Sequence, residues 1–316
     1  MSEPTAPLVI IGDAQKQDVA ASKGPTDIMD GIYRAKQYVK DEEKDALIHP
    51  RHMAFDQPWQ WAADQWRKAR GHRDPESLDR VFLGTLAGCN LMCDECYVGD
   101  CNGVETKQVT PSEYVEAYLR YRGAYGQCST LRVSGGEPFL HQRWVENVVN
   151  CTPPWFRHLQ KVVIWVDTNL TIYPTENLRD TLVNFRENAA ICGCLKPNRQ
   201  YVTGETVSLD TQLDIVRTII DAGINLFLYW PAWDKEPNGN LFWDTLLELK
   251  TIDEYLPLRL TVTETKKYEA SPRMEHIPYG DLNVFFKTRR NVHHDFLLDN
   301  YHPDLIHMPS HLTLSL

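Results

Sequence analysis

The sequence predicts an α/β fold, built on a parallel β-sheet that is covered on both faces. From Val81 onward, short and nearly continuous apolar runs alternate with amphipathic stretches, as expected for strands that are buried on both sides. The chain has 316 residues, of which 42% are hydrophobic and 24% charged, and this suits one large α/β domain with additions or two modest domains. The predicted strands are Val81–Leu86, Thr130–Val133, Lys161–Val166, Ala189–Leu195, Asn225–Trp230 and Leu256–Val262.

Helix start signals stand between these strands. Thr110 and Glu113 have the spacing of a capping box, and Pro111 occupies the first position of the predicted helix. Thr175 and Ser208 are the expected first caps of two further helices. Strands that alternate with helices in this way are typical of a parallel sheet.

The first 80 residues follow a different pattern. Residues 1–26 are polar and contain several prolines and glycines, so we expect a mobile arm there. Residues 27–46 predict a helix, and the apolar positions from Trp59 to Ala69 fit one helical face. We therefore expect three parts: an N-terminal arm and helical extension (1–80), an α/β unit (81–265) and a C-terminal extension (266–316).

Composition and charge exclude several classes of protein. No apolar run approaches the ~18–20 residues that a membrane-spanning helix needs, so no membrane partner is expected. The N-terminus carries an acid and two prolines instead of the basic residues of a signal peptide, which favours a cytoplasmic location. The net charge of −10 makes nucleic acid an unlikely partner. The 8 cysteines are therefore interpreted as thiols or metal ligands rather than disulfides.

Three cysteines follow the first predicted strand directly. Cys89, Cys93 and Cys96 have the spacing C-x3-C-x2-C, so one loop can bring three thiolates to one centre. Three ligands leave one iron of a 4Fe–4S cluster without a protein ligand, and that iron can bind a substrate or cofactor. A structural zinc site needs a fourth ligand, and Cys101 is placed to supply it. The spacing favours the cluster, and the zinc site remains the alternative.

A glycine-rich segment follows the second predicted strand. It consists of Gly135, Gly136, Glu137 and Pro138. The two glycines have no side chains, so a ligand can approach their backbone closely. A Gly-Gly-Glu triplet alone is weak evidence for a binding site, because most such triplets only form turns. One strand–helix unit after the three-cysteine loop, it becomes a strong signal for a site.

Together the two motifs resemble those of the radical S-adenosylmethionine (radical SAM) enzymes, over roughly residues 81–265. Within that superfamily the sequence is most similar to the glycyl-radical-enzyme activating enzymes, the pyruvate formate-lyase activating enzyme-like branch. Asp167-Thr168-Asn169 resembles the Asp-Thr-Asn-Gly stretch of that branch, and Leu195-Lys196 resembles its Leu-Lys pair. Two positions depart from the pattern: Glu95 replaces a frequently aromatic residue, and Leu170 replaces the usual glycine.

The resemblance implies a fold, two cofactors and their ligands. The fold is a partial (β/α)6 barrel with ligands at the carboxyl ends of the strands. A 4Fe–4S cluster would be held by Cys89, Cys93 and Cys96. S-adenosylmethionine would be bound by residues drawn from Gly135, Gly136, Glu137, Pro138, Asp167, Asn169, Lys196 and Tyr97.

The resemblance also implies a reaction. The reduced cluster cleaves S-adenosylmethionine, and the 5′-deoxyadenosyl radical takes hydrogen from a substrate, so no dedicated acid–base residue is expected. We expect a small-molecule or peptide substrate and an electron donor such as flavodoxin or ferredoxin. An activase that installs a glycyl radical on a partner enzyme is the alternative. A non-enzymatic iron–sulfur or zinc-binding protein is the alternative of another class.

Overall fold

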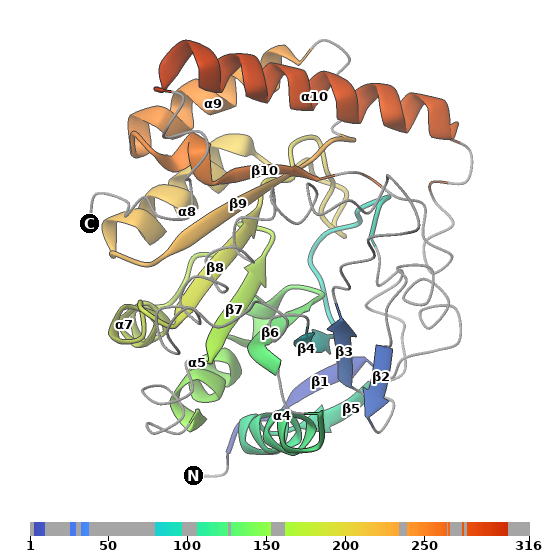
Figure 1. Cartoon of the computed structure of the whole chain (residues 1–316), viewed down its shortest axis with the longest axis vertical. Helices are drawn as coiled ribbons and strands as arrows, with labels where there is room; N and C mark the ends of the chain where they lie inside the picture. Colours follow the sequence, from blue (N-terminus) through green and yellow to red (C-terminus); the bar gives the residue numbers. More distant parts are fainter. Residues whose placement is uncertain are drawn as a thin grey trace.

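Six parallel strands form the centre of the fold in the computed structural model (Figure 1). They are β4 (Arg80–Leu86), β6 (Cys128–Gly135), β7 (Val163–Thr168), β8 (Ala189–Cys194), β9 (Leu226–Pro231) and β10 (Leu260–Thr263). Their order in the sheet follows their order along the chain. The structure describes residues 3–9, 26–29, 33–37, 80–96, 106–125, 128–152, 162–233, 239–263, 265, 274 and 277–302.

The predicted α/β fold is confirmed, and each predicted strand is present with small shifts at its ends. The largest shift concerns the last strand, because Leu256–Arg259 forms the 3-10 helix η3 and only the following residues join the sheet. Pro257 lies in the first turn of η3, where the missing N–H of proline leaves no helical hydrogen bond unmade, so the residue favours the helical turn over an earlier start of the strand.

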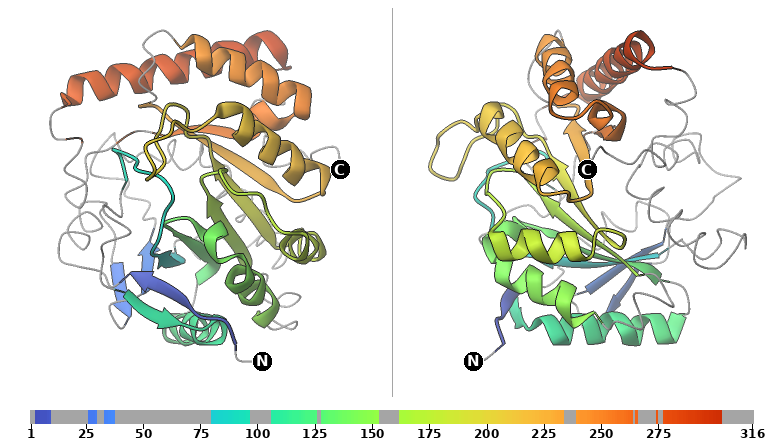
Figure 2. Two further views of the ribbon diagram at one scale, coloured as in Figure 1. Left: turned by 180° about the vertical axis from the view of Figure 1, so that it is seen from behind. Right: turned by 90° about the vertical axis from the view of Figure 1, so that its left-hand side faces the viewer.

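Helices alternate with the strands along the outer side of the curved sheet (Figure 2). The capping box is confirmed, because the backbone N–H of Thr110 donates to the Glu113 carboxylate over 2.7 Å and the Glu113 N–H donates to the Thr110 hydroxyl over 3.2 Å. Thr175 and Ser208 cap their helices as expected. The helices are α4 (Pro111–Tyr125), α5 (Gln142–Cys151), α7 (Glu176–Asn184), α8 (Leu209–Asp221), α9 (Asn240–Ile252) and α10 (Tyr279–Asn300), with the 3-10 helix η2 (Pro138–His141) before α5.

Both faces of the parallel strands are buried, which explains their nearly continuous apolar sequences. In β7, Ile164 and Val166 belong to the large core beneath the helices. Val163 and Trp165 point to the opposite face and form a smaller cluster with residues of β8 and β9. This second face is the inner side of the partial barrel.

The N-terminal residues that the structure describes are strands, so two expectations were wrong there. β1 (Ala6–Val9) lies within the expected mobile arm, and β2 (Thr26–Met29) and β3 (Tyr33–Gln37) are strands where a helix over 27–46 was expected. The remainder of that range lies outside the described residues. Asp-Gly between β2 and β3 is a strong hairpin signal, and it was outweighed in the sequence by an apparent helical pattern. The helical face expected from Trp59 to Ala69 lies outside the described residues.

These N-terminal strands extend the sheet beyond β4. β1 runs antiparallel to β4, with Leu8 opposite Leu86, and also pairs with β5 (Thr106–Val109). β3 pairs with the first part of β4 and with β2. The sheet is therefore continuous from the expected N-terminal part into the α/β unit, and the three domain boundaries remain a prediction.

Helix α10 lies within the range expected as a C-terminal extension. It follows β10 and packs on β10 and α9, so it is the helix of the sixth strand–helix unit (Figure 1). No helix among the described residues combines the length and the apolar character needed to cross a lipid bilayer.

Candidate functional site

The predicted site residues come from the carboxyl ends of four neighbouring parallel strands. The cysteine loop (residues 87–96) follows β4, the glycine segment ends β6, Asp167 to Asn169 end β7, and Lys196 follows β8. Parallel strands place these ends at one edge of the sheet. The fold therefore brings together segments that are more than one hundred residues apart in the sequence.

The three cysteines share one small apolar cluster. Cys93 is buried, while Cys89 and Cys96 are partly buried and pack against the same cluster, which contains Leu91 and Val207. The N–H of Leu91 donates to the Cys89 sulfur over 3.4 Å. Burial raises the pKa of the Cys93 thiol to about 12. Among the described residues, no three Cys, His, Asp or Glu side chains meet as ligands of a single metal ion.

The two glycines of the second motif let β6 approach the backbone of the cysteine loop. The N–H of Gly136 donates to the carbonyl of Leu86 over 2.7 Å. A Cβ on Gly136 would lie 2.0 Å from the carbonyl oxygen of Gly88. Gly135 has a φ of +113° and would place a Cβ 2.4 Å from the Leu86 nitrogen. The contact partner of both glycines in this structure is thus protein backbone.

Glu137 is fully buried and joins the ends of three strands. Its carboxylate accepts hydrogen bonds from the hydroxyl of Thr168 over 2.9 Å and from the N–H of Asn169 over 2.7 Å. It also accepts from the N–H of Phe139 over 2.9 Å and so caps η2, which Pro138 begins. Burial raises the pKa of this carboxyl to about 7, although the three donors oppose the shift.

Asp167 points to the inner side of the barrel. Its carboxylate accepts the indole N–H of Trp165 over 2.6 Å and forms an ion pair with Arg132 over 2.7 Å. The guanidinium of Arg132 also lies over the Trp165 ring, 4.4 Å from its centre. All three side chains come from the inner face, and those of Arg132 and Asp167 are about one fifth exposed, at 23% and 18%.

Asn169 reaches the cysteine loop. Its side-chain amide donates to the Asn90 side chain over 2.9 Å and approaches the Cys89 sulfur at 3.8 Å. The next residue, Leu170, has a φ of +56°, a conformation that glycine adopts without strain. The turn expected for glycine therefore persists with leucine, whose side chain is fully buried and packs where Gly193 has no Cβ.

Lys196 takes part in a buried charge network with two residues that the motif analysis did not select. The Lys196 ammonium lies 3.3 Å from the Glu95 carboxylate, and Nε of Arg199 lies 3.1 Å from both Glu95 oxygens. Burial raises the pKa of Glu95, but the two cations outweigh burial and hold that pKa at about 2. Burial opposes ionisation of Lys196 too, yet its pKa is raised well above the ordinary value by neighbouring thiols and Glu95.

The loop after β8 also pairs with the cysteine loop through backbone bonds. The N–H of Met92 donates to the carbonyl of Gln200, and the N–H of Val202 donates to the carbonyl of Asn90, each over 2.9 Å. Leu91 and Tyr201 form an isolated antiparallel bridge between these bonds. The cysteine loop is therefore held from two sides, by the end of β6 and by the loop after β8.

Gln212 is a structural link that sequence reasoning missed. This buried side chain donates to the carbonyl of Asn169 over 2.6 Å and accepts the N–H of Lys196 over 2.9 Å. It thereby ties the ends of β7 and β8 together. Gln212 lies inside a helix, so nothing in its sequence context marks it; the same holds for Arg199 in a loop. Tyr97 and Cys101 lie outside the described residues.

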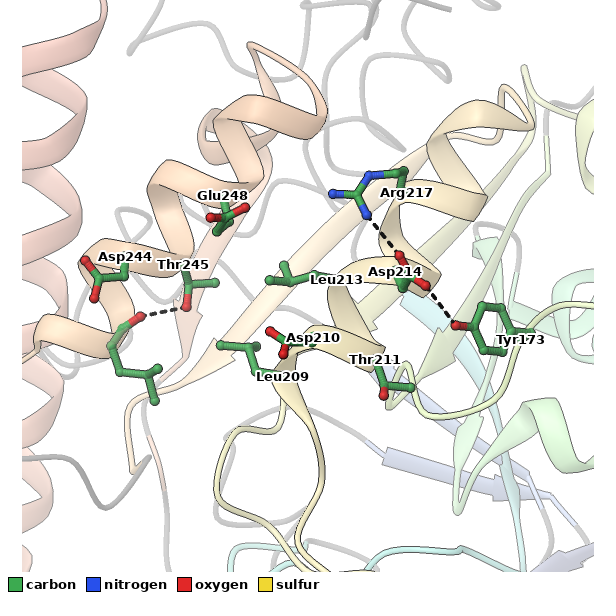
Figure 3. A pocket seen from close by; sticks show the side chains of 11 residues that line it. Tyr173, Leu209, Asp210, Thr211, Leu213, Asp214, Arg217, Asp244, Thr245 and Glu248 are labelled. Atoms are coloured by element: carbon green, nitrogen blue, oxygen red, sulfur yellow. Dashed lines mark hydrogen bonds and ion pairs between the residues drawn. The ribbon is translucent and has the colours of Figure 1, made fainter.

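A cavity of about 550 Å³ lies away from these residues, in the outer layer between α8 and α9 (Figure 3). Tyr173 from the loop after β7 closes one side of it, and its hydroxyl donates to Asp214 over 3.3 Å. None of the predicted site residues lines this cavity. The site thus lies at the strand ends, and the cavity is a separate feature.

Comparison with known families identifies one match. Residues 80–190 match the family model of a 4Fe–4S single cluster domain, a range that contains all three loop cysteines. A search among curated proteins finds no match to this chain.

Several solved structures are similar at low identity. Streptococcus suis SuiB bound to S-adenosylmethionine is 15% identical with a TM-score of 0.49, covering 67% of this chain and 45% of SuiB. Native anSMEcpe with bound AdoMet and Kp18Cys peptide is 16% identical with a TM-score of 0.48, covering 68% and 60%. A radical SAM methyltransferase from Sphaerobacter thermophilus is 15% identical with a TM-score of 0.43, covering 67% and 64%. This chain spans less than two thirds of the length of each.

Proposed function

We propose that the protein is a radical SAM enzyme, in which Cys89, Cys93 and Cys96 hold a 4Fe–4S cluster beside bound S-adenosylmethionine. The observation that carries the proposal is the contact between the two motifs. The N–H of Gly136 donates to Leu86 and the N–H of Glu137 donates to Gly88, on either side of the turn that leads to the cysteines. The match of residues 80–190 to a 4Fe–4S single cluster domain supports it.

The residues of the loop fit an iron–sulfur cluster. Three thiols stand on one loop, and thiolate is the ligand that such clusters take. Each thiolate of a cluster binds a different iron, so the sulfurs need not converge on a single ion. Burial raises the pKa of the Cys93 thiol, and two cations beside the loop, Lys196 and Arg199, oppose that rise.

The chain's own residues position the cofactors. Glu137 and Gln212 are buried, and their hydrogen bonds fix the strand ends. Lys196 presents an ammonium group that suits the methionine carboxylate of S-adenosylmethionine, and Asn169 presents an amide beside Cys89. When bound, the cluster supplies the electron that breaks a carbon–sulfur bond of S-adenosylmethionine, which yields methionine and a 5′-deoxyadenosyl radical.

The substrate we propose is a small molecule or a peptide that enters the inner side of the barrel. Arg132 and Asp167 form a partly exposed, charged wall there, and the Arg132 guanidinium covers the buried ring of Trp165. Such a wall suits a polar ligand of limited size. A cytoplasmic electron donor such as flavodoxin or ferredoxin would reduce the cluster.

Iron analysis tests the cofactor. Anaerobically purified protein is expected to be brown and to contain about four irons per chain. Cys89→Ala, Cys93→Ala and Cys96→Ala should each lose the colour. Cys151→Ala is the matched control, because Cys151 lies on α5, apart from the loop, and its removal should leave the iron in place. Stoichiometric zinc without iron would instead establish the zinc-binding alternative.

Product analysis tests the reaction. The reduced protein should convert S-adenosylmethionine to 5′-deoxyadenosine and methionine. A bound cluster without this cleavage would indicate an electron carrier, and S-adenosylhomocysteine as sole product would indicate methyl transfer. Deuterated cell extract then identifies the substrate: label in 5′-deoxyadenosine from small molecules or peptides supports the proposal. Label from one large protein, together with a glycyl radical signal, would establish an activase.

A further inference from the structure

A buried carboxylate stands inside the cysteine motif. Glu95 lies between Cys93 and Cys96, and its side chain is only 8% exposed. Its partners are Lys196, which is 16% exposed, and Arg199, which is 2% exposed. A buried charge without a partner would be strongly destabilising, so the three charged side chains must be present together.

The two cations are held differently. Arg199 is fixed by further bonds, because its guanidinium donates to the carbonyls of Pro197 and Trp233 and its backbone carbonyl accepts the N–H of Val207. The Lys196 ammonium is carried by a flexible four-carbon stem, and its hydrogen bond to Glu95 is the longer one. Arg199 therefore sets the position of the Glu95 carboxylate, and that carboxylate sets the position of the ammonium.

Glu95 offsets positive charge beside the three cysteines. Its carboxylate faces two buried cations, Lys196 and Arg199, and Asp94 adds a second negative charge near Arg199. Positive charge next to an iron–sulfur cluster favours its reduced form, which carries one more electron, and raises its reduction potential. Cleavage of a sulfonium needs a strongly reducing electron, so an excess of positive charge would oppose the reaction.

We propose that Glu95 is a positioning residue of the cluster site, which orients Lys196 toward the cofactors and keeps the cluster's reduction potential low by offsetting the charge of Lys196 and Arg199. This inference rests on the proposed function. It assigns a role to a residue of the cysteine loop that is not itself a cluster ligand.

The test is a potentiometric titration followed by electron paramagnetic resonance, on the whole chain with its cluster. Glu95→Gln keeps the shape of the side chain and removes its charge, and should raise the midpoint potential. We expect at least a tenfold change in the ratio of reduced to oxidised cluster at a fixed potential, which is 59 mV for one electron. Lys196→Gln removes a positive charge and should shift the potential in the opposite direction.

Controls separate the local network from net charge. Asp244→Asn removes a carboxylate that lines the outer cavity, and its potential should equal that of the wild type. The double variant Glu95→Gln with Lys196→Gln should return close to the wild-type potential. If Glu95→Gln does not retain iron, a wild-type potential in Lys196→Gln still overturns the charge argument, because it would show that this network does not act on the cluster.

The outcomes separate this inference from the proposed function. Wild-type protein without a cluster or without cleavage of S-adenosylmethionine overturns the proposed function. A wild-type cluster that cleaves S-adenosylmethionine, combined with unchanged potentials in both single variants, overturns only the role of Glu95. An upward shift in Glu95→Gln together with weaker binding of S-adenosylmethionine supports both parts of that role.

Discussion

Replacing Gly136 with alanine tests whether the glycine motif holds the cysteine loop in place. The added Cβ would lie 2.0 Å from the carbonyl oxygen of Gly88 and 2.7 Å from its carbonyl carbon. Ordinary contact begins at 3.4 Å, so the two backbones must separate by more than an ångström. The hydrogen bonds that Gly136 donates to Leu86, at the end of β4, and that Glu137 donates to Gly88, in the cysteine loop, would then lengthen or break.

The cost of this separation follows from the atoms involved. Forcing an extra methyl group into a packed site costs about 1–3 kcal/mol when side chains can adjust. Here the opposing atoms belong to the backbone and cannot rotate away, so we expect about 3 kcal/mol or more. For a chain of this size, with an unfolding entropy of about 2.1 cal/mol/K per residue, 3 kcal/mol corresponds to a fall in Tm of roughly 4–5 °C. The displaced loop should also bind less iron than wild type does after identical reconstitution.

Gly280→Ala is the matched control. Gly280 lies in α10, and an added Cβ would meet nothing within 4 Å, so alanine should be neutral or slightly stabilising. Thermal melting of the apoprotein and iron content after reconstitution measure the two effects separately. Equal melting and equal iron in Gly136→Ala and wild type would refute the reasoning.

Two further predictions concern stability. Burial lowers the pKa of His293 from 6.5 to about 4. The contribution of the neutral ring to the free energy of unfolding is therefore complete above pH 6.5 and is lost as the pH falls through 4. Its size is on the order of 2–3 kcal/mol. The His293 ring contacts the carbonyl of Pro257. His293→Gln should reduce the loss of stability on acidification, whereas replacing the exposed His294 with Gln should not. Equal acid sensitivity in the two variants would contradict this prediction. Both Leu170→Gly and Leu170→Ala should lose packing, but the glycine variant should be more stable by about 1 kcal/mol in chemical denaturation. Glycine adopts the positive φ of this position without strain, and alanine does not. The reverse order of stability would show that strain at this turn is unimportant.

The parallel part of the fold could be predicted because its signals are local. Apolar runs buried on both faces, the Thr110–Glu113 capping box and the N-caps act over a few residues, and the structure retains them. The strands near the N-terminus were missed for two reasons. The local Asp-Gly signal of the β2–β3 hairpin was outweighed by an apparent helical pattern. In addition, β1 and β3 pair with β4, which begins more than forty residues after β3 ends.

The site was predictable as a set of segments but not as a network. Sequence patterns selected the cysteines, Glu137 and Lys196, and the fold brings their segments to one edge of the sheet. The patterns did not show that the Glu137 carboxylate is fully engaged by protein donors. Nor did they show the partners of Glu95, which follow it by 101 and 104 residues. Such contacts follow from the three-dimensional arrangement and leave no periodic signal.

The position of β4 within the sheet has a consequence for association between molecules. A strand at the margin of a sheet offers unpaired N–H and C=O groups to other chains. Here β3 and β1 cover the outer side of β4, and within the described residues the margins fall to β2, β5 and β10. Each of these three strands has only 4 residues, and short marginal strands are poor templates for pairing. The strand that leads into the cysteine loop is thereby shielded from edge-to-edge aggregation.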